Sequence, residues 1–239
     1  MKLKIRLLLI SVLLIQVVYS YFNLEKEYYF EMYDEVEKSF SENNDDNVEQ
    51  LILKYNNSDI KGIITINGEE DFNYPIVKSI NNDYYLTHDY YKNYDKYGSV
   101  VLDYRVDLDN SKKIILYGHS SKYEDTYFNK LELYYDKSYY DNHKYINIVT
   151  ENNNYRYEIF SVYVETEDFS YMNLNFANKS DWYQHLVTLK NKSIYDIDID
   201  LDKNDSILIM QTCSNSSYYS SYDKKYLLII SRRVNIEKS

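Results

Sequence analysis

The sequence predicts a mostly β domain, either a barrel or a sandwich, preceded by helices. Three observations support this fold class. The chain has 239 residues, which suits one ordinary domain. Apolar residues make up 44% of the chain and charged residues 27%, so a hydrophobic core can form and disorder of the whole chain is excluded. From Lys61 onward, short runs rich in Ile, Val and Tyr recur at intervals typical of all-β proteins.

Seven of these runs are predicted strands, and many short strands at this spacing favour a barrel or a sandwich. They span residues 62–66, 99–103, 113–117, 145–149, 156–164, 206–212 and 226–231. Two helices are expected between the strands, one over 125–135 and one over 180–195. Ser180 is the expected N-cap of the second helix, whose apolar face includes Trp182 and Leu186.

The N-terminal segment 1–22 has the layout of an export signal. Lys2, Lys4 and Arg6 precede an apolar run over 7–19. The segment is shorter than the roughly 20 apolar residues that cross a bilayer comfortably, so a cleaved signal peptide and a retained anchor both remain open. Because the basic residues come first, a retained segment leaves the rest of the chain outside the cell.

The segment 23–58 predicts a helical stalk and N-terminal helices. Its apolar residues are three and four positions apart, as on one face of a helix, and polar residues interrupt the pattern near 43–46. The remaining residues, 59–239, form the expected β-rich domain.

Charge and composition exclude several function classes. The formal net charge of −11 argues against nucleic acid as a partner, because that affinity depends on Lys and Arg neutralising phosphates. The 32 tyrosines fit an A/T-rich coding sequence rather than an aromatic binding surface. Cys213 is the only cysteine, which excludes an internal disulfide and any multi-cysteine metal site. The sequence has no P-loop, GxGxxG or HExxH motif, and no cofactor is expected.

The candidate reactive residues are Cys213 and His119. Cys213 ends an apolar strand ahead of a polar loop, where a nucleophile is well placed; the alternative is a buried thiol that fills a core gap. His119 also follows an apolar strand, after Gly118, so both residues can reach one rim of a barrel. The other three histidines, His88, His143 and His185, are expected to be structural or solvated.

Five segments of the sequence resemble class B sortases, which are exported cysteine transpeptidases of Gram-positive bacteria. These segments are NYPIVKSINNDYYLTHDYY (73–91), YGSVVLDYR (97–105), IILYGHSS (114–121), EIFSVYVE (158–165) and ILIMQTC (207–213). The resemblance implies a closed β-barrel of about eight strands, with N-terminal helices and a helix inserted before the cysteine strand. It also makes 59–239 the catalytic domain and implies membrane attachment through 1–22, with the domain on the extracellular face.

The resemblance further implies a chemistry. Cys213 would attack a Thr carbonyl in a C-terminal sorting signal of a surface protein and form a thioester. His119 would protonate the departing amine and later deprotonate the incoming one. The acceptor amine would belong to a cell-wall cross-bridge or to another protein's lysine. An ordinary thiol is only a few per cent ionised at neutral pH, so slow turnover is expected.

One departure from the family pattern concerns an arginine that follows the cysteine and steadies the oxyanion. Lys225 is the candidate substitute here, with Lys224 or Tyr226 in its place if the loop shifts by one residue. Arg232 would lie about 23 Å farther along the strand. Because loss of one oxyanion donor typically costs about 100- to 1000-fold in rate, the sequence leaves open a weakened homologue that binds or scaffolds surface proteins.

Overall fold

The computed structural model describes residue 16, residues 19–21 and residues 47–234. Two compact units make up the chain, residues 1–46 and residues 47–239. Most of the expected segment 1–22 and most of the expected segment 23–58 lie outside the described residues. Within the described residues, no helix combines the length and apolar character that crossing a bilayer requires.

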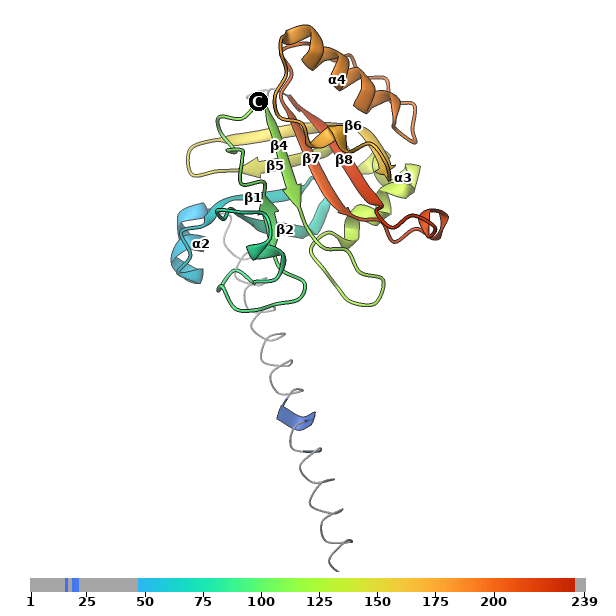
Figure 1. Cartoon of the computed structure of the whole chain (residues 1–239). Helices are drawn as coiled ribbons and strands as arrows, with labels where there is room; N and C mark the ends of the chain where they lie inside the picture. Colours follow the sequence, from blue (N-terminus) through green and yellow to red (C-terminus); the bar gives the residue numbers. More distant parts are fainter. Residues whose placement is uncertain (1–15, 17–18, 22–46, 235–239) are drawn as a thin grey trace, which may run out of the picture. The chain divides into compact units, whose positions relative to one another are not determined.

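The second unit is a closed barrel of eight strands (Figure 1). The strands are β1 (Ile60–Ile66), β2 (Glu69–Val77), β3 (Val100–Leu102), β4 (Lys113–Tyr117), β5 (Tyr145–Val149), β6 (Asn154–Glu165), β7 (Ile207–Cys213) and β8 (Tyr226–Val234). They follow the order β1-β2-β3-β4-β7-β8-β6-β5 around the barrel, and β5 pairs with β1 to close it. The pairs β2–β3 and β4–β7 are parallel, and the other pairs are antiparallel. The expected closed barrel of about eight strands is therefore confirmed.

Short helical segments connect the strands. They are α2 (Val48–Tyr55), η1 (Tyr84–Leu86), η2 (Asn129–Tyr135), α3 (Lys137–Asn142), η3 (Phe169–Met172), α4 (Lys179–Asn191) and η4 (Ser217–Tyr219). Helix α2 begins after Asn47, whose side chain accepts from the amide of Glu49, and it buries Val48, Leu51 and Tyr55. This helix therefore belongs to the barrel unit. In Figure 1, α2 and α4 lie at opposite margins of the barrel.

The barrel core consists mainly of aliphatic and aromatic side chains. All five residues of β4 are buried, as are the first four of β7, so these two neighbours are covered on both faces. Each fully buried Ile or Leu of this kind contributes about 1.5–3 kcal/mol relative to an exposed position. The apolar runs of β4 and β7 in the sequence therefore reflect their central place in the barrel.

Each of the seven predicted strands overlaps an observed strand, although 99–103 and 206–212 extend one residue beyond β3 and β7, and β2 was not predicted. The sequence of β2 contains three acidic residues and Pro75, which hide its period-two pattern. The helix expected over 125–135 is wrong in type and start: a 3₁₀ helix begins only at Asn129, whose amide side chain binds the Glu124 carbonyl and the Ser121 amide.

The helix expected over 180–195 is present with shifted ends. It runs from Lys179 to Asn191, and its N-cap is Asn178 rather than Ser180. The side-chain oxygen of Asn178 accepts from the amides of both Ser180 and Asp181, which satisfies two free donors of the first turn.

Candidate active site

Strands β4 and β7 bring His119 and Cys213 to the same end of the barrel. The two strands pair in parallel and in register, with Tyr117 opposite Gln211. The amide of Gly118 donates to the Gln211 carbonyl at 3.2 Å, which continues the pairing by one residue. His119 and Cys213 each lie two residues beyond the last Cα pair. The expectation that these distant residues meet at one rim therefore has a direct structural basis.

Gly118 and Leu86 fix the position of His119. A Cβ atom on Gly118 would lie 2.7 Å from the ring of Phe128, so only glycine allows this close approach. The His119 carbonyl accepts from the Phe128 amide at 3.1 Å. Nε2 of the His119 ring is 2.8 Å from the Leu86 carbonyl and must donate, because a carbonyl oxygen only accepts. In the neutral ring, Nδ1 is then the acceptor nitrogen.

Cys213 is the last residue of β7 and is exposed to solvent. Its Cα partner on β8 is Tyr226. The amide of Ser214 donates to the Lys225 carbonyl at 2.9 Å, and the amide of Asn215 donates to Oε1 of Glu132 at 2.9 Å. Both backbone donors that directly follow the cysteine are therefore already engaged within the protein.

The side chains of the same loop are also anchored. Asn215 donates through Nδ2 to Oγ of Ser120 at 2.7 Å, which links the loop to the residue after His119. The Tyr135 hydroxyl lies 2.8 Å from Oγ of Ser214. Segment η2 and the residue after His119 thus hold the loop that begins at Cys213.

The pKa of the Cys213 thiol lies above its ordinary value. Although the residue is exposed, protein atoms around the sulfur remove part of its hydration, and this desolvation is the largest cause. The Lys225 charge lowers the pKa and the Glu132 carboxylate raises it further. Burial also raises the pKa of Glu132 itself. Two charges of opposite sign therefore act on the sulfur.

The charge of Lys225 acts on Cys213, whereas Arg232 and Arg233 lie at the other end of β8. Arg232 pairs with Ile207 at the opposite end of β7, where its guanidinium binds Glu158 at 2.9 Å and the Asp200 carbonyl at 2.6 Å. Lys224 lies 5.7 Å from the centre of the Phe169 ring. The structure thus places Lys225, of the three candidates named, where a charge reaches the sulfur.

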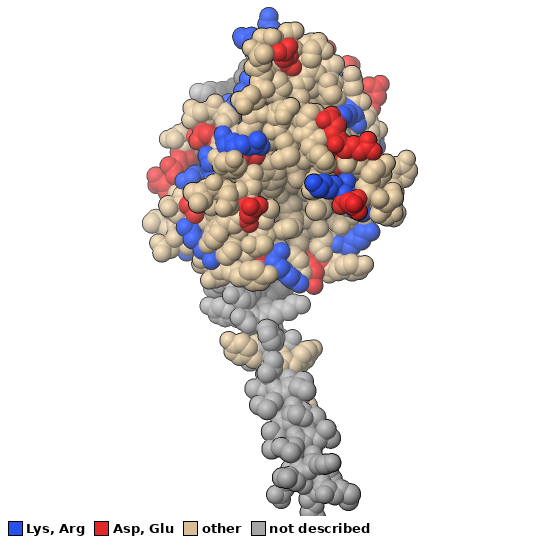
Figure 2. Space-filling view, in the orientation of Figure 1, with Lys and Arg blue, Asp and Glu red and all other residues tan. Residues whose placement is uncertain are grey.

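A segment after β6 forms a wall beside β4 and β7. The Tyr171 hydroxyl donates to Oε1 of Gln211 at 2.7 Å. Arg105 binds Asp103 through two nitrogens, at 2.9 and 2.7 Å, and donates to the Met172 carbonyl at 3.4 Å. Figure 2 shows a hollowed central region of uncharged residues on this side of the barrel, with both signs of charge interspersed around it.

Asp103 is fully buried and stays ionised. Its burial opposes ionisation, but Arg105 and the Tyr117 hydroxyl, which donates at 2.7 Å, outweigh that cost and lower the pKa to about 2. Asp103 and Arg105 lie in segment 97–105, one of the segments that resemble the family, so the sequence resemblance could have pointed to this pair. Glu132 and Tyr171 lie outside those segments, so the resemblance did not point to them.

The remaining histidines have structural surroundings. The ring of His88 stacks on Tyr84 with centroids 4.1 Å apart, and the ring of His143 stacks on Tyr139 at 4.0 Å. His185 lies on α4 and contacts Lys113. No group of three or more His, Cys, Asp or Glu residues that could hold a metal ion occurs in the described part of the chain.

Comparisons with known proteins agree with this geometry. A model of the sortase domain matches residues 70–232. Sortase B of Staphylococcus aureus (strain NCTC 8325 / PS 47) is 32% identical over 174 residues, which cover 72% of this chain and 70% of the relative. Sortase B of Listeria monocytogenes serovar 1/2a (strain ATCC BAA-679 / EGD-e) is 34% identical over 164 residues, 68% of this chain and 66% of the relative.

A solved structure shows the same barrel. The Staphylococcus aureus sortase B–substrate complex matches with a TM-score of 0.76 and 27% sequence identity, covering 90% of this chain and 100% of that chain. The fold and these relatives define a cysteine transpeptidase. The chain belongs to the sortase family, in class B.

Replacing Glu132 with Gln tests the electrostatics around the thiol. Glu132→Gln keeps a side-chain oxygen for the Asn215 amide but removes a charge that raises the Cys213 pKa. We expect the pKa to fall and alkylation by iodoacetamide at pH 7 to accelerate about 3-fold. The measurement is the labelling rate against pH. Glu151→Gln, on an exposed residue between β5 and β6, is the matched control; an equal shift in both variants would contradict the assignment.

Proposed function

We propose that Cys213 is the nucleophile and His119 the general acid and base of a transpeptidation at this rim. The observation that carries the proposal is the parallel, in-register pairing of β4 and β7, which ends beside both residues. The Cys213 thiolate attacks the carbonyl carbon of a sorting signal, a C–S bond forms, and the C–N bond breaks. The proton of the imidazolium passes to the departing amine. An incoming amine then attacks the thioester, gives its proton to the imidazole and releases the thiolate.

The hydrogen bond to Leu86 assigns separate roles to the two ring nitrogens of His119. Nε2 holds the Leu86 carbonyl and orients the ring. Nδ1 is then the nitrogen that exchanges a proton with the leaving and entering amines. A histidine oriented through one nitrogen and reactive through the other is a common arrangement in enzymes.

Lys225 is our candidate for stabilising the oxyanion. The amides of Ser214 and Asn215 are engaged by Lys225 and Glu132, so these two donors are not free for a tetrahedral intermediate. The Lys225 ammonium acts on the sulfur and supplies positive charge there. It lacks the planar set of donors that an arginine offers, which would cost part of the oxyanion stabilisation.

The substrate and acceptor follow from the family. The sortase B neighbour was solved as a substrate complex, and we propose that this chain likewise binds a sorting-signal peptide of a surface protein. The acceptor is the amine of a cell-wall cross-bridge or of a protein lysine. The hollow over β4 and β7, walled by the segment around Tyr171, is the proposed peptide site.

Trapping of a covalent intermediate tests the proposed reaction. Full-length protein is incubated with a panel of sorting peptides, and the mass of the Cys213 peptide is followed. We expect an acyl adduct on Cys213 with at least one peptide, and release of that adduct by an added amine. Cys213→Ala is the control. No adduct above that control with any peptide would contradict the proposal.

A weakened homologue that binds surface proteins is the second candidate, and the absence of an arginine between Cys213 and Arg232 in the sequence favours it. Lys225→Arg separates the two candidates, with Lys225→Gln as the matched variant. If Lys225 is an imperfect oxyanion donor, we expect Lys225→Arg to raise the acylation rate about 10-fold and Lys225→Gln to lower it. Fast acylation by the unmodified protein, unchanged in both variants, would remove the second candidate and the role of Lys225 together.

We also propose that the protein is exported and held at the membrane by residues 1–22, with the barrel on the extracellular side. The support is the sequence: three basic residues ahead of an apolar run. Expressed in a Gram-positive host, the full chain should be found in the membrane fraction with its N-terminal peptide intact by mass spectrometry. Recovery from the medium of a chain cleaved after Ser20 would show secretion instead.

A further inference from the structure

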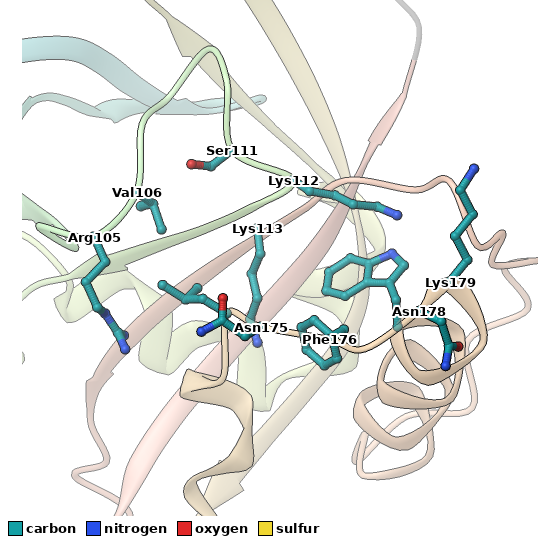
Figure 3. Close-up of a pocket in the computed structure, with 11 residues that line it drawn as sticks. Arg105, Val106, Ser111, Lys112, Lys113, Asn175, Phe176, Asn178 and Lys179 are labelled. Atoms are coloured by element: carbon teal, nitrogen blue, oxygen red, sulfur yellow. The ribbon is translucent and has the colours of Figure 1, made fainter.

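A second cavity lies at the far end of β4 from the candidate catalytic pair. It has a volume of about 530 Å³ and is open to solvent. Its walls come from the residues after β3, the start of β4, and the segment that leads into α4, and Figure 3 shows the residues that line it. The chemistry of its lining is carried by Arg105, Lys112, Lys113, Phe176, Lys179 and Trp182.

The cavity is lined by four cations and, among the described residues, by no Asp or Glu. This is unusual in a chain whose formal charge is −11. Lys112 donates to the Lys203 carbonyl at 2.8 Å and lies 4.8 Å from the Trp182 ring, and Lys179 donates to Oδ1 of Asn204 at 2.9 Å. Each of these ammonium groups has three donors and uses one here, so donors remain for a ligand.

Lys113 is the buried cation of the cavity. Only 3% of the residue is exposed, and Nζ contacts the Asn173 carbonyl at 2.8 Å and Nε2 of His185 at 2.9 Å, both neutral acceptors. Burial, with a smaller contribution from Arg105, lowers the pKa of Lys113 to about 7. Burial and the Lys113 charge lower the pKa of His185 to about 3, so the imidazole stays neutral.

The nearby carboxylates do not supply the missing negative charge. Asp103 is bound by Arg105 through two hydrogen bonds. Asp205 and Asp202 act on Lys112, yet its pKa remains below the ordinary value because burial and Lys179 outweigh them. The inside of this cavity is therefore electrostatically suited to an anion.

The cavity also lies in line with the candidate catalytic residues. In the parallel pairing of β4 with β7, Lys113 lies opposite Ile207, and Cys213 is six residues farther along β7. Six strand residues span about 20 Å. The wall segment covers the strand pair between the two places, since the Tyr171 side chain binds Gln211, the Asn173 carbonyl binds Lys113, and Ile115 and Ile209 are fully buried.

We propose that this cavity binds an acidic side chain of a peptide that lies over the wall segment toward Cys213, about six extended residues from the scissile bond. The proposal rests on the proposed function for its peptide substrate. The carboxylate pairs with the exposed Lys112 and Lys179, the buried charge of Lys113 attracts it from within the protein, and the rings of Phe176 and Trp182 exclude water around it. Since a bound carboxylate favours protonated Lys113, affinity should fall as the pH rises above about 7.

A binding measurement without catalysis tests the charge preference. The full chain carrying Cys213→Ala is titrated with a fluorescein-labelled peptide of four glutamates and with the matching glutamine peptide. By fluorescence anisotropy, we expect the glutamate peptide to bind at least about 10-fold more tightly. The double variant Lys112→Gln, Lys179→Gln should lose this preference. The control Lys96→Gln, Lys144→Gln removes the same charge from an exposed and a partly exposed residue elsewhere and should keep the preference.

Three outcomes would overturn the proposal: equal binding of both peptides, equal loss in the control variant, or inorganic phosphate binding as tightly as the glutamate peptide. The last would show a site for free anions. Thermal unfolding of each variant verifies that it is folded. Because the probe has no sorting motif and Cys213 is absent, failure here leaves the proposed transpeptidation untouched, and failure of acyl trapping leaves this result standing.

Tethering tests the position of the site. The tetraglutamate peptide is made with an activated disulfide placed two, six or ten residues from the glutamates, on either side, and is reacted with the wild-type chain. The Cys213 thiolate displaces the thiopyridone and forms a mixed disulfide. We expect the six-residue spacing on one side to react about 10-fold faster than its glutamine counterpart. Equal rates at all spacings would contradict the proposed line of the peptide.

Discussion

The parallel, in-register pairing of β4 with β7 is the constraint on which the candidate site depends. The two strands are 89 or more residues apart in the sequence, and their buried central residues set the register by packing on both faces. A slip of one residue would turn every side chain of β7 to the opposite face of the sheet. Core packing several residues away therefore sets the position of Cys213 at the end of β7. This position does not depend on the loop that follows being rigid.

Beyond the last paired residues of β4 and β7, local contacts rather than core packing position the candidate catalytic residues. Gly118 lets the chain pass the Phe128 ring, and the Leu86 carbonyl then fixes the His119 ring. On the other side, Glu132 binds the Asn215 amide while its charge raises the pKa of the thiol that Lys225 lowers. The Glu132 carboxylate thus helps to order the loop but lowers the fraction of Cys213 that is ionised. The positive charge of Lys225 offsets this effect of Glu132.

The sequence contained much of the fold and only part of the site. Continuous apolar runs predicted the strands, because strands buried on both faces need such runs. Strand β2 was not predicted because its acidic start and Pro75 interrupt the alternation of apolar and polar residues. Pairing with its neighbours decides its conformation instead. Cys213 and His119 could be named from their motifs. The roles of Glu132 and Leu86 could not, because both act through contacts across dozens of residues that no local pattern records.

Lys113 makes the case that the far cavity is more than a packing feature. The pKa of a lysine in the unfolded chain is about 10.5, whereas burial lowers the pKa of Lys113 in the folded protein to about 7. Between these values the unfolded chain binds more protons, so folding stability rises with pH across that window, and below about pH 7 the folded protein carries the full cost of a buried ammonium. An apolar side chain of similar length would avoid that cost. A carboxylate in the cavity would offset it by pairing with the ammonium, and the pairing energy would appear as affinity. Lys113 is buried on the strand that also leads to His119 and has no ion-pair partner among the residues that the structure describes. A ligand that brings the counterion with it would explain this arrangement most simply.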